Sequence, residues 1–374
     1  MLIDASAAYN QLAGIGRYSR NLIPRVIDQL PGQQWTLLRA PERTSIAWPG
    51  GAIAASVRQR TTPFSRKRAD QLWFRLGIPL DVRLFAGTQD LVYSPDFTAP
   101  PLKGAPSVVT VHDLAFLTHP QYATPGLQRY LARVVPREVE RADRVVAVSD
   151  ATRDDLVTCL GVSPAKIDVV RNGVDDRFLG ADPLTDLQRL RLGIPDRYVL
   201  MVGTIEPRKN HLTAFDTIQI INERVKVPLV VAGKPGWGFD EVLAQSADLE
   251  QGGVVIRLDH VAESDLPGLY ASASSLLYPS WTEGFGLPVL ESLAAGTPVV
   301  TGTAPALREV GGAFVHYMDP ADPQGMADIL LSIIEAPPDR HRRADLQRWA
   351  ASFSWDDSAI ALANVLRRYD RNST

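Results

Sequence analysis

The stretch Tyr198-Val199-Leu200-Met201-Val202-Gly203-Thr204 joins a short apolar run to a turn that begins with glycine. Strands that are buried on both faces of a sheet have continuous apolar runs of this kind, whereas half-exposed strands alternate apolar and polar residues. Comparable runs lie at 91–93, 107–111, 144–148, 228–232, 275–278 and 297–301. Stretches with helical spacing separate most of them, an order typical of parallel sheets with helices on both faces. The sequence therefore predicts an α/β fold of the doubly wound class, formed twice.

The length of the chain favours two domains. Its 374 residues exceed what one hydrophobic core usually organises. A predicted strand ends at the turn Asn172-Gly173, and mostly polar residues separate this turn from the run that begins at Tyr198. We therefore expect an N-terminal domain at 1–175, a linker, and a C-terminal domain at 190–352.

Composition and charge exclude several classes of function. Hydrophobic residues make up 45% of the chain and charged residues 22%, so the protein can bury a core and is not disordered. A formal net charge of −3 gives no positive field that would attract nucleic acid. The single cysteine, Cys159, allows no intrachain disulfide, as is usual in a reducing compartment. Because we find neither a signal peptide nor an apolar run of about 20 residues, we expect a soluble cytoplasmic protein.

The strongest chemical signal follows the predicted strand at 275–278. Backbone amides at a helix N-terminus that begins with glycine bind phosphate well. The residues expected to form such an N-terminus here are Gly284, Phe285, Gly286 and Leu287. Glu283 and Glu291 are eight positions apart, which on one helix would put both on roughly the same side, about two turns apart. The two carboxylates would then accept hydrogen bonds from sugar and ribose hydroxyls. The alternative is an ordinary helix with two surface glutamates.

A second signal follows the strand at 198–202. Gly203 opens a turn that contains the adjacent cations Arg208 and Lys209, at the strand end where open α/β sheets bind ligands. The two cations would neutralise a departing diphosphate without a metal ion. After the strand at 228–232, Lys234 lies in a glycine-rich turn that we place near the same diphosphate. Solvated surface cations are the alternative interpretation at both positions.

Polar residues of the N-terminal half complete the candidate site. His112 and Asp113 come directly after the strand at 107–111, so we expect both to face the candidate cleft, with Asp113 on the sugar or acceptor side. The alternative is a histidine satisfied at a strand end, with Asp113 capping the next helix. Gly14 and Gly16 precede the first long helix and permit close approach of a ligand, and Arg17 would reach donor phosphates or an anionic acceptor.

Together these motifs resemble the retaining GT-B glycosyltransferases of family 4. The resemblance implies two Rossmann-like domains that face a central cleft, with the final segment 353–374 returning to the N-terminal domain. It implies that Glu283 faces the transferred sugar and that Glu291 binds the ribose. It also implies that His112 touches the sugar and is the catalytic candidate of the N-terminal domain. The family carries an arginine and a lysine after Gly-Thr-x-x-Pro, usually several residues apart. Which of Arg208, Lys209 and His211 contacts which phosphate is therefore open.

The motif forms are most similar to bacterial mannosyltransferases that build surface polysaccharide and O-antigen. The resemblance implies a nucleotide-sugar donor, GDP-mannose in the first instance, a glycan or lipid-linked acceptor, and front-side attack with retention. The sequence has no Asp-x-Asp, so we expect neither a metal nor another cofactor. Two alternatives are a sugar-nucleotide epimerase of the same architecture and a non-catalytic sugar-nucleotide binding module.

Basic and aromatic residues alternate at 64–76, a pattern found where proteins contact an anionic membrane or a lipid diphosphate. This segment is our candidate for peripheral contact with the inner membrane face. The alternative is an amphipathic helix with Trp73 and Leu76 in the core of the first domain.

Overall fold

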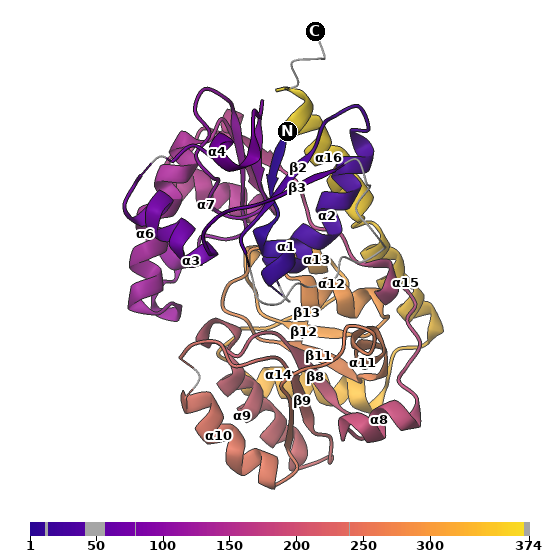
Figure 1. The fold of residues 1–374 in the computed structure, drawn as a ribbon. Helices are drawn as coiled ribbons and strands as arrows, with labels where there is room; N and C mark the ends of the chain where they lie inside the picture. The colour runs from indigo at the N-terminus through magenta and orange to yellow at the C-terminus, as the bar shows by residue number, and fades with distance from the viewer. Residues whose placement is uncertain (12–13, 42–56, 79, 239, 370–374) are drawn as a thin grey trace. The chain divides into compact units, whose positions relative to one another are not determined.

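The computed structural model describes residues 1–11, 14–41, 57–78, 80–238 and 240–369 (Figure 1). The chain divides into two compact units. The first unit comprises 1–118, 125–173 and 354–374, and the second comprises 119–124 and 174–353.

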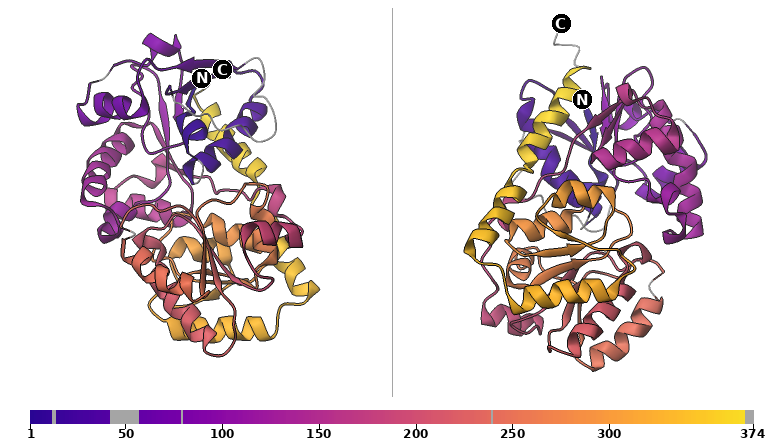
Figure 2. Two further views of the ribbon diagram at one scale, coloured as in Figure 1. Left: turned by 60° about the horizontal axis from the view of Figure 1, so that its bottom comes forward. Right: turned by 180° about the vertical axis from the view of Figure 1, so that it is seen from behind.

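Each unit contains a parallel sheet with helices on both sides (Figure 2). In the described part of the first unit the strand order is β3-β2-β1-β4-β5-β6-β7. These strands are β1 Leu2–Asp4, β2 Thr36–Arg39, β3 Arg58–Thr61, β4 Val92–Ser94, β5 Ser107–Val111, β6 Arg144–Ala147 and β7 Ile167–Val169. The α-helices are α1 Ser6–Asn10, α2 Ile15–Gln29, α3 Arg66–Ala69, α4 Arg83–Ala86, α5 Ala115–Thr118, α6 Pro125–Arg141, α7 Asp150–Leu160 and α16 Trp355–Arg367.

The second unit repeats this plan with the strand order β10-β9-β8-β11-β12-β13. Its described strands are β8 Val199–Val202, β9 Leu229–Ala232, β10 Val255–Leu258, β11 Ser275–Tyr278, β12 Val299–Thr301 and β13 His316–Tyr317. The α-helices are α8 Asp186–Leu192, α9 His211–Asn222, α10 Asp240–Gln251, α11 Leu266–Ser272, α12 Leu287–Ala294, α13 Pro305–Gly311, α14 Pro323–Glu335 and α15 Arg340–Ala351. Two doubly wound α/β sheets are thus present, as the apolar runs predict.

The central strands are almost wholly buried, because helices cover both faces of each sheet. In the second unit the core between sheet and helices includes Val199, Met201, Phe215, Leu277 and Leu330, all at most 2% exposed. Because both faces of these strands are buried, apolar residues occur at successive positions and not only at alternate ones.

The final helix α16 completes the first unit. It packs against α2, and Arg25 Nε lies 3.0 Å from Asp356 Oδ1. Ser354 caps the helix by accepting hydrogen bonds from the amides of Asp356 and Asp357. At the start of the helix, a Cβ on Gly173 would lie 2.1 Å from the Trp355 nitrogen, so only glycine permits this crossing of two backbones.

The boundary between the units differs in detail from the predicted one. The residues assigned to a linker already belong to the second unit, which begins at Val174 and includes α8. They are fixed by packing, since Phe178 is buried against Tyr270 and the amide of Gly180 donates to the carbonyl of Ala294. The short segment 119–124 also belongs to the second unit, which no sequence signal indicated.

Candidate active site

The candidate site lies at the point where the strand order of the second sheet reverses. β8 and β11 are neighbours there, although β9 and β10 lie between them in the sequence. Loops that follow the two strands diverge at such a point and leave room for a ligand at the carboxyl edge of the sheet. Arg208 and Lys209 follow β8, and Glu283 follows β11.

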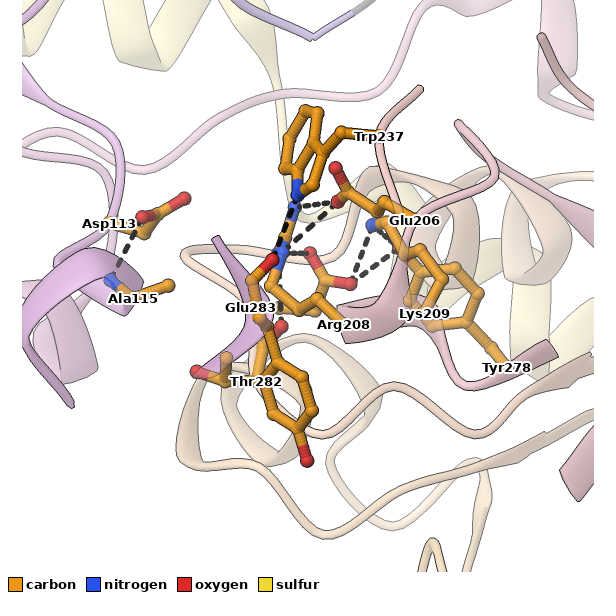
Figure 3. A network of polar contacts seen from close by, with 10 residues as sticks. Asp113, Ala115, Glu206, Arg208, Lys209, Trp237, Tyr278, Thr282 and Glu283 are labelled. Atoms are coloured by element: carbon orange, nitrogen blue, oxygen red, sulfur yellow. Dashed lines mark hydrogen bonds and ion pairs between the residues drawn. The ribbon is translucent and has the colours of Figure 1, made fainter. Parts of the chain in front are cut away.

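These three side chains form one buried cluster of charges (Figure 3). Arg208 NH1 lies 2.8 Å from Glu283 Oε2, and Lys209 Nζ lies 2.6 Å from Glu283 Oε1. Lys209 also donates to the Tyr278 hydroxyl at 2.5 Å, and that hydroxyl donates to Glu283 Oε1 at 2.8 Å. The guanidinium of Arg208 further donates to Glu206. The carboxylate and the two cations that the sequence singled out are therefore brought together.

The cluster shifts the ionisation of its members. Burial opposes ionisation of Glu283, but Arg208 and Lys209 outweigh it and lower the pKa of this carboxyl to about 2. Burial lowers the pKa of Lys209, and Glu283 offsets part of that effect. Glu283 is thus a carboxylate at any physiological pH. A carboxyl whose pKa is lowered this far by two specific cations, at the carboxyl edge of a parallel sheet, is a candidate for a functional site.

Local backbone geometry explains why adjacent cations can share one carboxylate. Residues Pro207–Lys209 form a single 3₁₀ turn that ends at Asn210, whose φ of 59° is left-handed. The Asn210 side chain offsets this strain by donating to the carbonyls of Pro279 and Pro320, at 3.2 and 2.7 Å. The amide of Trp281 donates to the carbonyl of Arg208 at 3.0 Å. The loops after β8 and β11 are therefore tied together by backbone and side chain.

Gly203 follows the last residue of β8 and lies next to the Lys209 side chain of this turn. Its φ is 148°, and a Cβ there would lie 3.5 Å from Cε of Lys209. A Cβ on neighbouring Gly233 would lie only 1.8 Å from the Gly203 carbonyl oxygen. Gly233 therefore lets the loops after β8 and β9 approach closely, whereas the positive φ of Gly203 is what favours glycine at that position.

His211 is buried but uncharged. It is 1% exposed, and among the described residues neither ring nitrogen has a hydrogen-bond partner. Burial, and to a smaller extent Lys209, lowers its pKa to about 3. A neutral imidazole adds no positive charge for a phosphate, which leaves Arg208 and Lys209 as the cations of this turn.

The two glutamates do not share a helix, contrary to the geometry that the sequence suggested. Glu283 lies in the loop before α12, and only Glu291 lies in the helix. The reason is Gly286, whose φ of 110° places the start of the helix at Leu287. Glu291 is 2% exposed, and its Oε2 accepts a hydrogen bond from the Tyr270 hydroxyl at 2.9 Å. Its contact with a ribose stays a prediction.

The glycine-led segment lies at the helix N-terminus, as expected, but most of it is buried. Gly284, Phe285 and Gly286 are buried, and Leu287 is half-buried. The Phe285 ring packs edge-on against Phe353 at 6.1 Å. A phosphate contact would therefore involve backbone amides rather than side chains here.

Lys234 is exposed in the turn after β9. The alternative interpretation, a solvated surface lysine, is therefore compatible with the structure. Its carbonyl accepts from the amide of Ile205, which joins this turn to the loop after β8. Further along the same turn, Trp237 Nε1 donates to the carbonyl of Tyr122 at 2.8 Å (Figure 3).

In the first unit, His112 follows β5 and is half-buried. Its Nε2 lies 2.8 Å from the carbonyl oxygen of Pro95, and its ring packs edge-on against Tyr18 at 4.9 Å. A carbonyl only accepts, so Nε2 carries the proton and Nδ1 carries the lone pair of the neutral ring. Burial lowers the pKa of His112, which favours this neutral form. Asp113 accepts from the amide of Ala115, the first residue of α5, at 3.0 Å, although Leu114 rather than Asp113 is at the N-cap position of that helix.

The glycine loop before α2 also has a structural requirement. Gly14 has a φ of 54° and precedes the first residue of the helix. A Cβ on Gly16 would lie 1.9 Å from the carbonyl oxygen of Gln11, so glycine is needed there whether or not a ligand binds. Arg17 is half-buried on the first turn of α2.

Sequence reasoning missed two members of the cluster. Glu206 is 3% exposed and contacts Arg208, and Tyr278 joins Lys209 to Glu283. Because Glu206 stands two residues before Arg208, the sequence indicates that the two residues are close together. It does not indicate that their side chains face each other. Tyr278 ends an apolar strand, and this pattern predicts a core residue rather than a member of a polar cluster.

The segment at 64–76 is only partly as expected. It forms α3 and a π-helical turn at Asp70–Arg75. Trp73 is buried and its Nε1 donates to the carbonyl of Leu80 at 3.1 Å, whereas Leu76 is 68% exposed. The alternative interpretation was therefore right for Trp73 and wrong for Leu76, and membrane contact stays a prediction.

Two negative findings apply to the described residues. No helix there is long and apolar enough to cross a membrane. Within the same ranges, no group of three or more His, Cys, Asp or Glu side chains is placed to bind a metal ion.

Comparisons with known proteins identify the family. A model described as glycosyl transferases group 1 matches residues 186–348, and one described as Glycosyltransferase Family 4 matches 30–178. The O-antigen chain mannosyltransferase B of Escherichia coli is 28% identical over 95% of this chain and 96% of its own length. A D-inositol 3-phosphate glycosyltransferase of Salinispora arenicola is 34% identical over 70% of this chain, which spans 63% of that relative.

The fold agrees with this assignment. Sucrose-phosphate synthase from Thermosynechococcus elongatus superimposes with a TM-score of 0.75 over 98% of both chains, at 17% identity. The two family models together cover most of the chain, the two sheets repeat one strand order, and the charged cluster lies at the edge where such sheets bind ligands. This protein is a glycosyltransferase of family 4 with the GT-B fold.

Proposed function

We propose that this enzyme transfers mannose from GDP-mannose, with retention of configuration, to a glycan or lipid-linked acceptor during synthesis of a bacterial surface polysaccharide. The observation that carries the proposal is the pairing of the buried Glu283 carboxylate with both Arg208 and Lys209. The sugar and the pathway are supported by the full-length similarity to an O-antigen chain mannosyltransferase.

In the proposed reaction the bond between the sugar C1 and the diphosphate oxygen breaks, and a bond forms between C1 and an acceptor hydroxyl oxygen. The acceptor proton passes to the departing phosphate, and the nucleoside diphosphate leaves. Retention follows if attack and departure occur on the same face of the sugar. Arg208 and Lys209 would stabilise the negative charge that develops on the leaving group, which is the largest electrostatic demand of the step.

We propose that this charge stabilisation requires no metal ion. Arg208 and Lys209 meet at one carboxylate, and on this proposal their N–H groups would bind the departing phosphate in place of a divalent ion. Glu283 would orient both cations and accept hydrogen bonds from hydroxyls of the transferred sugar. Glu291 would bind the ribose.

His112 is proposed to accept a hydrogen bond from a hydroxyl of the transferred sugar. The support is its tautomer, since the carbonyl of Pro95 occupies the protonated Nε2 and Nδ1 is the acceptor. On this proposal His112→Ala lowers kcat more than it raises KM for the donor.

A second acceptor class is phosphorylated inositol. It is favoured by the similarity to a D-inositol 3-phosphate glycosyltransferase. The catalytic cluster would be the same in both cases.

Peripheral contact with the inner membrane face is also proposed, because a lipid-linked acceptor resides there. The apolar side chains Leu76, Ile78 and Leu84 of the first unit are 44 to 69% exposed and lie close together in the sequence. Co-sedimentation with vesicles containing anionic lipid, compared with neutral vesicles, tests this contact.

The test of function is a panel of nucleotide sugars with purified enzyme. Release of nucleoside diphosphate is measured with and without a lipid-linked glycan or an inositol phosphate, and the product's anomeric configuration is determined by NMR. We expect acceptor-dependent release of GDP from GDP-mannose, with retention, unchanged by EDTA. Acceptor-independent conversion of the donor would instead indicate an epimerase, and binding without turnover would indicate a non-catalytic module.

A further inference from the structure

Glu206 is a buried carboxylate to which the proposed reaction gives no role. Its side chain is 4% exposed, and Oε1 accepts hydrogen bonds from Arg208 Nε at 3.1 Å and from NH2 at 2.8 Å. Burying a carboxylate costs free energy unless it is paired. A carboxylate next to a phosphate-binding arginine therefore needs an explanation.

Glu206 fixes the orientation of the Arg208 guanidinium. The guanidinium is planar, and Glu206 binds its Nε and NH2 edge. The NH1 group then donates to Glu283 Oε2 at 2.8 Å and to the carbonyl of Thr282 at 3.0 Å. Hydrogen bonds to Glu206 on one side and to Glu283 and Thr282 on the other thus hold the guanidinium in one orientation.

Glu206 also changes the charge of the cluster. Arg208 and Lys209 contribute two positive charges, and Glu206 and Glu283 contribute two negative charges, so these four side chains are formally neutral together. Without Glu206 the same set would carry one net positive charge. A nucleoside diphosphate carries more negative charge after transfer than it did as a sugar ester, so an excess positive charge would favour the product most.

We infer that Glu206 is a positioning residue that orients Arg208 and cancels part of its charge, and that it thereby limits the affinity of the site for the nucleoside diphosphate product and speeds product release. The inference rests on the proposed function, because it takes Arg208 as a residue that meets the diphosphate. It assigns Glu206 an effect on the release of the nucleoside diphosphate as well as on the orientation of Arg208.

A purely structural role and the inferred role predict opposite effects on nucleotide affinity. Glu206→Gln keeps the shape and the accepting oxygen but removes the charge. If Glu206 only orients Arg208, the variant binds GDP equally or more weakly. If it also cancels charge, the variant binds GDP more tightly, by roughly tenfold for one unit charge a few ångströms away.

The experiment measures GDP and UDP binding to the full chain by isothermal titration calorimetry, together with kcat and product inhibition. For the nucleotide that the wild type binds, we expect Glu206→Gln to lower the dissociation constant and the inhibition constant by similar factors and to lower kcat. Glu335→Gln, at an exposed position at the end of α14, is the matched control and should change neither constant.

Unchanged or weaker nucleotide binding by Glu206→Gln, with binding by the wild type intact, would overturn the inference. A wild-type protein that binds neither GDP nor UDP would refute the proposed function itself, and no variant is needed to see that result. The two failures are therefore distinguishable.

A double variant covers the case in which Glu206→Gln does not fold. Replacing both partners of a buried pair costs less than leaving one charge unpaired, so Glu206→Gln with Arg208→Gln should fold and bind GDP as weakly as Arg208→Gln alone. A double variant that still binds GDP more tightly than Arg208→Gln would show that Glu206 does not act through Arg208.

Discussion

Replacing Arg208 with lysine tests whether this side chain bridges two buried carboxylates. Its guanidinium donates to Glu206 through Nε and NH2, and to Glu283 and the carbonyl of Thr282 through NH1. The side chain is 17% exposed, so little water is present to replace these bonds. A lysine keeps the charge but offers a single ammonium, which cannot donate to Glu206 and to Glu283 with Thr282 at the same time.

The expected cost follows from the bonds that lysine cannot make. If the ammonium retains two of the four hydrogen bonds, two charge-assisted bonds are lost, at about 1.5 kcal/mol each. A loss of about 3 kcal/mol in the second unit lowers its melting temperature by roughly 6–12 °C for a unit of this size. On the proposal that the guanidinium also stabilises the leaving group, kcat should fall by about 10²–10³.

Differential scanning calorimetry and initial-rate measurements at pH 7.5 check both numbers. Arg348→Lys is the matched control, because Arg348 is 76% exposed and pairs only at the surface with Asp345, where such pairs are worth less than about 1 kcal/mol. If Arg208→Lys melts within about 1 °C of Arg348→Lys and turns over at the wild-type rate, the bridging geometry is wrong.

Three further substitutions test the cluster and its supporting turns. Glu283→Gln should lower stability at pH 7, and its difference from the wild type should shrink as the pH falls from about 4.5 towards 2, because the folded-state pKa of this carboxyl is about 2 and its stabilising effect needs the ionised form; a difference that is constant across acid denaturation curves would contradict this. Asn210→Ala should cost about 2–4 kcal/mol in denaturant unfolding, from three lost side-chain hydrogen bonds and a strained φ of 59°, and Asn210→Gly should recover only the backbone part; equal stability of the two variants would argue against strain. Gly233→Ala should impair folding or nucleotide binding, since its Cβ would lie 1.8 Å from the Gly203 carbonyl oxygen, and wild-type melting and GDP affinity would show that the loops can separate.

Much of the candidate site was predictable because it lies at the ends of strands. An apolar run that stops at a glycine or a proline fixes where a loop begins: Arg208 and Lys209 follow a run that stops at Gly203, and Glu283 follows one that stops at Pro279. Parallel strands present their carboxyl ends at one edge, so polar residues that follow neighbouring strands tend to meet. Sequence reasoning therefore found the right loops without knowing the order of the strands.

It failed where the backbone leaves the regular periodicity. Eight positions between Glu283 and Glu291 indicate one face only if both residues are helical, and the left-handed Gly286 excludes Glu283 from the helix. The exposure of Leu76 and the burial of Trp73 were likewise undecided, because π-helical and irregular turns do not follow the 3.6-residue repeat.

The sequence by itself determined the fold class, the family and the loops that contain the chemistry, because continuous apolar strands and short motifs are local features of the chain. Only the tertiary structure decided which charges pair. The partner of each cation depends on a strand order that brings β8 beside β11, on a left-handed residue at Asn210, and on a buried carboxylate at Glu206. Pairing energies arise between residues some 75 positions apart, and no local pattern records that distance in space.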